Sequence, residues 1–156
     1  MTHSQPDLRK NEQMPADSMS KQPDIRVDPI LGTTVHVVGH RQSRPNLPTN
    51  NAPSECPFCV GGQEAPEPYG VRFFVNRWPA MADERCEVVL YSSDHHASFS
   101  TLSVDAATEV IDLWAQRTSA LSSRPDVHYV LIFENRGAEV GATISHPHGQ
   151  IYAYDH

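Results

Sequence analysis

The chain has 156 residues with 12 basic and 19 acidic side chains, so its formal net charge is −7. This length suits one domain with a real hydrophobic core, and the negative charge argues against a nucleic-acid-binding protein with a broad basic surface. No stretch approaches the roughly 18 apolar residues of a membrane span, and the N-terminus has no apolar signal segment, so we expect no membrane partner and a cytoplasmic location.

Residues 1–24 are polar and lack hydrophobic periodicity, which predicts a disordered tail followed by one domain over 25–156. Strands are expected where β-branched and aromatic residues gather, at 34–39, 71–76, 87–91, 127–133 and 150–154. The run 127–133 is continuously apolar and is therefore predicted to be buried. A long helix is predicted from Val104 to Leu121, where apolar residues recur at steps of three and four behind Ser103, a candidate N-cap. Strands and helix do not alternate as βαβ units, so the expected fold class is α+β.

The densest group of polar residues is His-Pro-His-Gly-Gln at 146–150. Positions two apart on an extended chain point to the same face, so His146, His148 and Gln150 are expected to share one site, with Tyr152 continuing the row. Two imidazoles and an amide cannot form a hydrophobic core face. The alternative is an exposed strand with surface histidines, since a chain with nine histidines can contain such a pair by chance.

Cys56 and Cys59 form a Cys-x-x-Cys pair, whose spacing suits two sulfur ligands of a tetrahedral zinc ion. Two further ligands could then come from His95, His96 or His146. A redox pair is a second interpretation, although it would favour a helix N-terminus over the Pro- and Gly-containing loops around this pair. A chemically inert pair is the third.

Two further features could bind phosphate. The loop 134–143 carries glycines and Thr143, whose backbone amides and hydroxyl can bind phosphate oxygens, although most such loops are simple turns. Arg41 and Arg44 lie three residues apart and could clamp a phosphate, or they could be solvated loop charges.

Five motifs follow one another along the chain. They are His-Arg-x-x-Arg-Pro at 40–45, Cys-Pro-Phe-Cys at 56–59, Phe-Val-Asn-Arg-Trp-Pro-Ala at 74–80, Phe-Glu-Asn-Arg-Gly at 133–137 and His-Pro-His-Gly-Gln at 146–150. In this order they resemble the galactose-1-phosphate uridylyltransferase family of the histidine-triad superfamily. The resemblance runs from about Arg26 to the last residue, and it implies a histidine-triad-like antiparallel half-barrel sheet with one long helix.

The resemblance also implies an activity, the exchange of UMP between UDP-glucose and galactose 1-phosphate through a uridylyl-histidine intermediate. His148 matches the nucleophile of the family, and Gln150 matches a residue that contacts the uridylyl phosphates. The ligands of a structural zinc ion, the expected cofactor, are matched by Cys56, Cys59, His95 and His146, with His95 a better match than His96. The other substrate-binding positions are matched by Arg41, Arg44, Phe74, Asn76, Trp78, Asn135, Gly141 and Thr143. The two arginines match residues that reach the substrate phosphate from a neighbouring subunit, whereas Arg77 stands where many relatives carry an acidic residue.

Family members are about twice as long and contain a second, related half. The chain is therefore expected to be an N-terminal half that turns over poorly alone and acts as a homodimer or in a complex with a C-terminal-half chain. Its expected small-molecule partners are UDP-glucose, UDP-galactose and hexose 1-phosphates. One alternative is a histidine-triad nucleotide phosphorylase or adenylyltransferase that acts on ADP-glucose or a dinucleoside polyphosphate. Another is a non-catalytic, zinc-stabilised module.

Overall fold

The computed structural model describes residues 24–39, 41 and 52–156. The expected tail at 1–24 lies outside the described residues except for Asp24, and Arg44 lies outside them as well. The elements, in chain order, are β1 Asp24–Val27, β2 Thr34–Val37, β3 Arg72–Val75, β4 Cys86–Leu90, α1 Val104–Ser122, β5 Tyr129–Phe133 and β6 His148–Tyr154, with 3₁₀ turns at Pro53–Glu55, Phe99–Thr101 and Ala138–Val140. None of the helices in these described ranges has the length and hydropathy that a membrane crossing requires.

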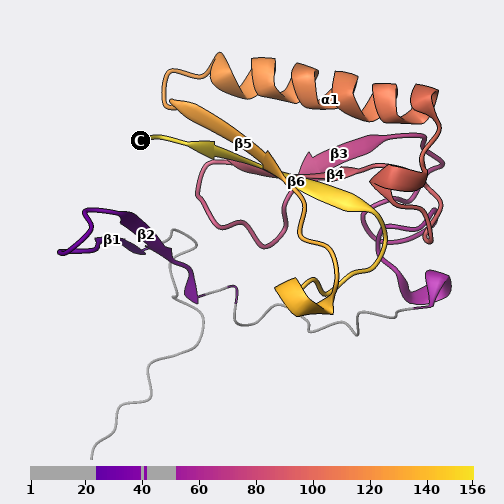
Figure 1. The fold of residues 1–156 in the computed structure, drawn as a ribbon, viewed down its shortest axis with the longest axis horizontal. Coiled ribbons are helices and arrows are strands. Elements are labelled where there is room, and N and C mark those ends of the chain that lie inside the picture. The colour runs from indigo at the N-terminus through magenta and orange to yellow at the C-terminus, as the bar shows by residue number, and fades with distance from the viewer. Residues whose placement is uncertain (1–23, 40, 42–51) are drawn as a thin grey trace, which may run out of the picture.

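Four strands form one antiparallel sheet in the order β3-β4-β6-β5 (Figure 1). The two inner strands are β4 and β6, and their register pairs Leu90 with His148 and Val88 with Gln150. The polar strand predicted from the sequence is therefore held in the middle of the sheet. The predicted α+β class, an antiparallel sheet with one long helix, is confirmed.

Helix α1 covers one face of this sheet (Figure 1). It begins where predicted, since the Ser103 hydroxyl accepts a hydrogen bond from the Ala106 amide at 3.2 Å. Val110 of the helix is fully buried in a core that it shares with Val89 and Ile151 of the two inner strands. Alternate residues of β6 thus pack under the helix, and the residues between them, including His148 and Gln150, face the other side.

The structure corrects two sequence expectations about strands. The run 127–133 is not buried, because β5 is an edge strand whose Tyr129 is 55% exposed. It pairs with β6 along one edge, and no strand pairs with its other edge among the described residues. Val130 and Ile132 are only partly buried where they pack against the core. Strand β6 begins at His148, two residues earlier than predicted, because pairing with β4 extends the strand through the histidine motif.

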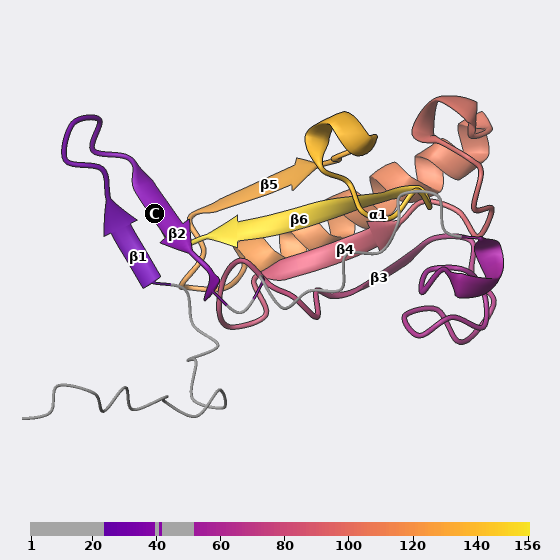
Figure 2. The same ribbon diagram turned by 90° about the horizontal axis from the view of Figure 1, so that it is seen from below.

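A third correction concerns β1, which sequence patterning did not predict because it lies at the margin of the polar tail. It pairs with β2 in a separate two-stranded hairpin (Figure 2). The hairpin meets the end of β6 through His36, whose ring stacks on that of His156 with centroids 5.6 Å apart. It lies at the end of the sheet opposite His148 and takes no part in the site described next.

Candidate active site and metal centre

A pocket of about 750 Å³ opens on the face of the sheet that α1 leaves uncovered. The structure brings into its lining every predicted catalytic and substrate-binding residue that it describes: Arg41, Phe74, Asn76, Trp78, Asn135, Gly141, Thr143, His148 and Gln150. Tyr152, which was expected to continue the histidine row, lines it too. Residues that are separated by more than 100 positions in the chain thus share one cavity, because β6 runs along its floor.

Hydrogen bonding defines which nitrogen of His148 carries the lone pair. Its Nδ1 lies 2.8 Å from the backbone carbonyl oxygen of His146. A carbonyl oxygen only accepts, so Nδ1 carries the proton, and in the neutral ring the lone pair is on Nε2. The ring of Phe58 packs edge-on against the His148 ring, with centroids 5.1 Å apart. The His148 ring is therefore held with its proton on Nδ1 and its lone pair on Nε2.

Gln150 is oriented by its neighbour on the same face of β6. The Tyr152 hydroxyl donates to Gln150 Oε1 at 3.4 Å and accepts from Arg41 Nη1 at 3.1 Å. With its oxygen engaged by Tyr152, the Gln150 amide presents its NH₂ group as the donor for an anionic ligand. Arg41 lines the pocket of its own chain, so its charge lies next to the same row.

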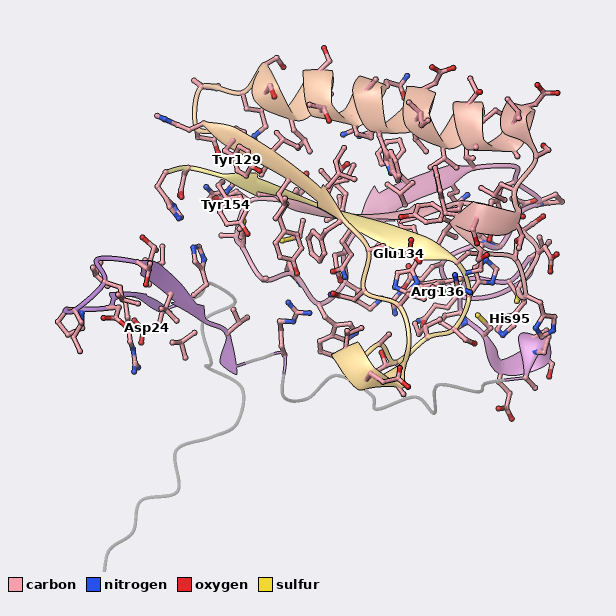
Figure 3. The ribbon with its side chains drawn as sticks, in the orientation of Figure 1. Asp24, His95, Tyr129, Glu134, Arg136 and Tyr154 are labelled. Atoms are coloured by element: carbon pink, nitrogen blue, oxygen red, sulfur yellow. The ribbon has the colours of Figure 1, made fainter. Side chains whose placement is uncertain are left out.

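Four residues from three segments converge at the end of the sheet that holds His148. One ligand atom each from Cys56, Cys59, His95 and His146 lies within 4.8 Å of the others. The Cys59 sulfur is 3.3 Å from His95 Nδ1 and 3.5 Å from His146 Nδ1. Figure 3 shows His95 close to sulfur atoms at this end of the sheet, far from Tyr129 and Tyr154 at the other. Two sulfurs and two imidazole nitrogens form a donor set that suits tetrahedral zinc.

The surroundings of this cluster bear on two questions that the sequence left open: which of His95 and His96 faces the cysteines, and whether the cysteines form a redox pair. His95 is buried whereas His96 is exposed, so His95 is the member of the pair that faces the cysteines. Cys56 and Cys59 are unbridged, and Cys56 ends a 3₁₀ turn instead of beginning a helix. The helix N-terminus that a redox pair would favour is therefore not found at this position.

A glycine allows the chain to turn tightly around the two cysteines. The Cys59 amide donates to the Cys56 carbonyl at 3.3 Å, and the Gly62 amide donates to the Cys59 carbonyl at 2.8 Å. A Cβ atom at Gly62 would lie 2.6 Å from the carbonyl oxygens of Cys56 and Pro57, a distance that real side chains do not adopt. Only glycine fits this turn, which we call the cysteine knuckle (residues 56–62).

The protonation of His146 also suits a metal. Burial lowers its pKa to about 4, so the ring is neutral near pH 7. Its Nε2 lies 2.8 Å from the carbonyl oxygen of Ser92, which can only accept, so Nε2 carries the proton and Nδ1 has the lone pair that faces Cys59. Burial, followed by the adjacent Cys56 sulfur, raises the pKa of Cys59 to about 11. A bound cation would stabilise the thiolate form that this environment disfavours.

Sequence reasoning assigned no role to several residues that surround the cluster. Tyr69 lies 2.9 Å from His146 Nε2 through its hydroxyl, and the Ser145 hydroxyl lies 3.2 Å from His95 Nε2. Ser145 directly precedes His146, so its position was a usable signal, whereas Tyr69 lies in a Pro-rich loop with no periodicity. Glu64 and Arg77 both line the pocket and form an ion pair at 2.9 Å, so the carboxylate offsets the charge of this arginine.

We expect the substitution Gly149→Ala to destabilise β6, the strand that carries His148 and Gln150. A Cβ at this position would collide with the hydroxyl of buried Tyr91 and lie 3.2 Å from the Phe133 carbonyl. Overpacking of this kind costs about 1–3 kcal/mol. Urea unfolding measures the loss, and the double variant with Tyr91→Phe should recover part of it because the colliding oxygen is removed. A stability unchanged by Gly149→Ala would show that the strand is not packed as described.

Comparison with known proteins agrees with this geometry. A family model described as "Galactose-1-phosphate uridyl transferase, N-terminal domain" matches residues 69–156. The galactose-1-phosphate uridylyltransferase of Streptomyces lividans is 46% identical over 136 residues, which cover 84% of this chain and 38% of the relative. The ADP-glucose phosphorylase of Arabidopsis thaliana is 26% identical over an alignment of 176 positions, which spans 88% of this chain and 50% of the relative.

A solved structure of a uridylyltransferase shares the fold with a TM-score of 0.68 at 25% identity, covering 85% of this chain and 46% of that one. The chain thus spans half or less of the length of these relatives. Over that part, the fold, the order of motifs and the sequence identity agree, and the chain belongs to the galactose-1-phosphate uridylyltransferase family, whose N-terminal domain it matches.

Proposed function

We propose that this chain is the nucleotidyl-transferring N-terminal half of a UDP-glucose–hexose-1-phosphate uridylyltransferase. The observation that carries the proposal is the hydrogen bond from His148 Nδ1 to the His146 carbonyl, which puts a nucleophilic lone pair on Nε2 of a residue that lines the pocket. Support comes from the family match and from the relative at 46% identity.

In the first step, His148 Nε2 attacks the α-phosphorus of UDP-glucose. A P–N bond forms, the P–O bond to the leaving group breaks, and glucose 1-phosphate departs with the bond's electron pair. The uridylylated ring is cationic because Nδ1 keeps its proton, and the His146 carbonyl stabilises this charge by accepting that N–H. The NH₂ group of Gln150 donates to a nonbridging oxygen as negative charge shifts onto it.

In the second step, a phosphate oxygen of galactose 1-phosphate attacks the same phosphorus. The P–N bond breaks, UDP-galactose leaves, and His148 returns to its starting tautomer. Arg41, Asn135 and Thr143 line the pocket and would bind phosphate oxygens. Phe74, Asn76 and Trp78 line it as well and would surround the uridine. Arg44, which lies outside the described residues, would supply a second cationic group for the substrate phosphates.

Zinc held by Cys56, Cys59, His95 and His146 has a structural role in this scheme, since all four protein ligands are supplied and none belongs to the reacting groups. It ties the cysteine knuckle to the strand that carries the nucleophile. The remaining wall of the pocket would come from a C-terminal half or from a second copy of this chain. We place the protein in the cytoplasm, where the unbridged cysteines stay reduced.

The test is transfer of labelled nucleotide to the chain. UDP-glucose labelled at the α-phosphorus is incubated with the chain alone and with the C-terminal half of the Streptomyces lividans relative, and ADP-glucose labelled in the same way is run in parallel. We expect acid-labile, base-stable label on His148 from UDP-glucose, much stronger when the second half is present, because an incomplete pocket positions the substrate poorly.

The two alternative functions predict different labelling of the chain. Preferential labelling by ADP-glucose would overturn the uridylyl assignment in favour of a phosphorylase such as the Arabidopsis relative. Absence of label from either nucleotide sugar, with the second half present, would contradict the proposed transfer and favour a non-catalytic, zinc-stabilised module.

A further inference from the structure

Tyr69 lies outside the substrate pocket, yet its hydroxyl is among the most heavily bonded side-chain groups near the site. The oxygen is 2.6 Å from the carbonyl of Phe58, 3.1 Å from the carbonyl of Ser92 and 2.9 Å from Nε2 of His146. These three partners come from the cysteine knuckle, from the loop after β4 and from the residues before β6. One phenol oxygen therefore joins three segments that are far apart in the chain.

The donors and acceptors of this group can be counted. Tyr69 has one hydroxyl proton, and the shortest contact directs it to the Phe58 carbonyl. His146 Nε2 carries a proton because the Ser92 carbonyl, 2.8 Å away, can only accept. That N–H is shared between the Ser92 carbonyl and a lone pair of the Tyr69 oxygen. The imidazole is thus fixed in rotation, with Nδ1 directed toward the sulfur of Cys59.

The same Tyr69 hydroxyl also fixes the position of Phe58, through its hydrogen bond to the Phe58 carbonyl. This residue lies between the two cysteines, is buried, and packs its ring on both His146 and His148. The hydrogen bond to the Phe58 carbonyl therefore fixes the cysteine knuckle. It also fixes the Phe58 ring, which packs beside His148. A phenylalanine at position 69 would keep the ring in place but leave the Phe58 carbonyl without this donor.

We propose that Tyr69 is a positioning residue for the metal centre: its hydroxyl connects the knuckle that carries the cysteines to the Nε2–H of His146, and so sets the nitrogen and the angle that His146 presents to a zinc ion. The inference rests on the proposed zinc site and adds a residue that contacts neither substrate nor metal. Outer groups that orient a ligating histidine strengthen metal binding by roughly 10- to 100-fold.

The test compares Tyr69→Phe with Tyr129→Phe, which removes the same atom from an exposed tyrosine of β5. Each zinc-loaded chain is mixed with an excess of a chromogenic chelator, and the rate of zinc release is followed. We expect Tyr69→Phe to bind about one zinc per chain but to release it roughly 10- to 100-fold faster than the wild type, with Tyr129→Phe unchanged. In the cobalt-substituted proteins, only Tyr69→Phe should shift the visible absorption bands, because a rotated His146 changes the ligand field.

The outcomes separate the two proposals. Absence of stoichiometric zinc in the wild-type chain overturns the metal site and the role of Tyr69 together. Zinc in the wild type, with release rate and cobalt spectrum unaltered in Tyr69→Phe, overturns the role of Tyr69 alone. If Tyr69→Phe fails to fold, nitrogen-15 NMR of the zinc-loaded wild type still decides, since a proton on His146 Nδ1 instead of Nε2 contradicts the bonding described.

Discussion

Replacing His148 with alanine should abolish the covalent uridylyl intermediate while leaving zinc content and fold intact. In the proposed reaction the His148 ring supplies the nucleophilic nitrogen, and it lies on the pocket face of β6 instead of in the core under α1. Loss of the nucleophile removes the two-step route altogether, so label should fall to background. Mass spectrometry of the chain after incubation with labelled UDP-glucose and a C-terminal half measures the effect.

A matched control is His96→Ala, which removes an exposed imidazole close to the metal cluster and should leave labelling unchanged. His148→Gly offers a complementary result, because its cavity should admit a soluble imidazole uridylylate and recover part of the second step. Label that appeared on His146 in the wild-type chain would reverse the assigned roles, since a nitrogen bound to zinc cannot also attack phosphorus.

The second large effect is expected from the double variant Cys56→Ser, Cys59→Ser. Serine hydroxyls are poor zinc ligands, so zinc content should fall from about one per chain to nearly none. Because the four ligands come together only in the folded chain, loss of metal also lowers the free energy of unfolding. A ligand present at ~1,000 times its Kd contributes about 4 kcal/mol, so a loss of this order is expected in urea unfolding.

Cys86→Ser provides the control, because Cys86 is also buried and unbridged but lies outside the cluster. It should keep the zinc, whatever it does to core packing. Zinc retained at full stoichiometry by the double variant would show that the two sulfurs are not ligands, and the proposed centre would have to be abandoned.

Much of the site could be predicted from the sequence, for local physical reasons. The two-residue period of an extended chain put His148, Gln150 and Tyr152 in one row along the pocket. His146, which was expected in the same row, precedes β6 and joins the cysteine cluster instead, so this part of the prediction was wrong. The cysteine spacing is a property of a tight knuckle. Helix α1 was predicted closely as well, because its apolar period and its N-cap are both encoded within one contiguous segment. Such features need no information from distant parts of the chain.

The rest depended on tertiary structure. Metal-ligand spacing alone did not separate His95 from His96, although the family resemblance favoured His95. The packing of their loop against residues 145 and 146 buries His95 and exposes His96. The edge position of β5 could not be seen in its apolar run, because burial depends on which strands flank it. Tyr69 had no pattern at all, since its role comes from three polar partners that are far apart in sequence. The sequence alone thus determined the chemical groups and their local spacing, whereas the tautomers of His146 and His148 were decided by backbone carbonyls whose positions exist only in the folded chain.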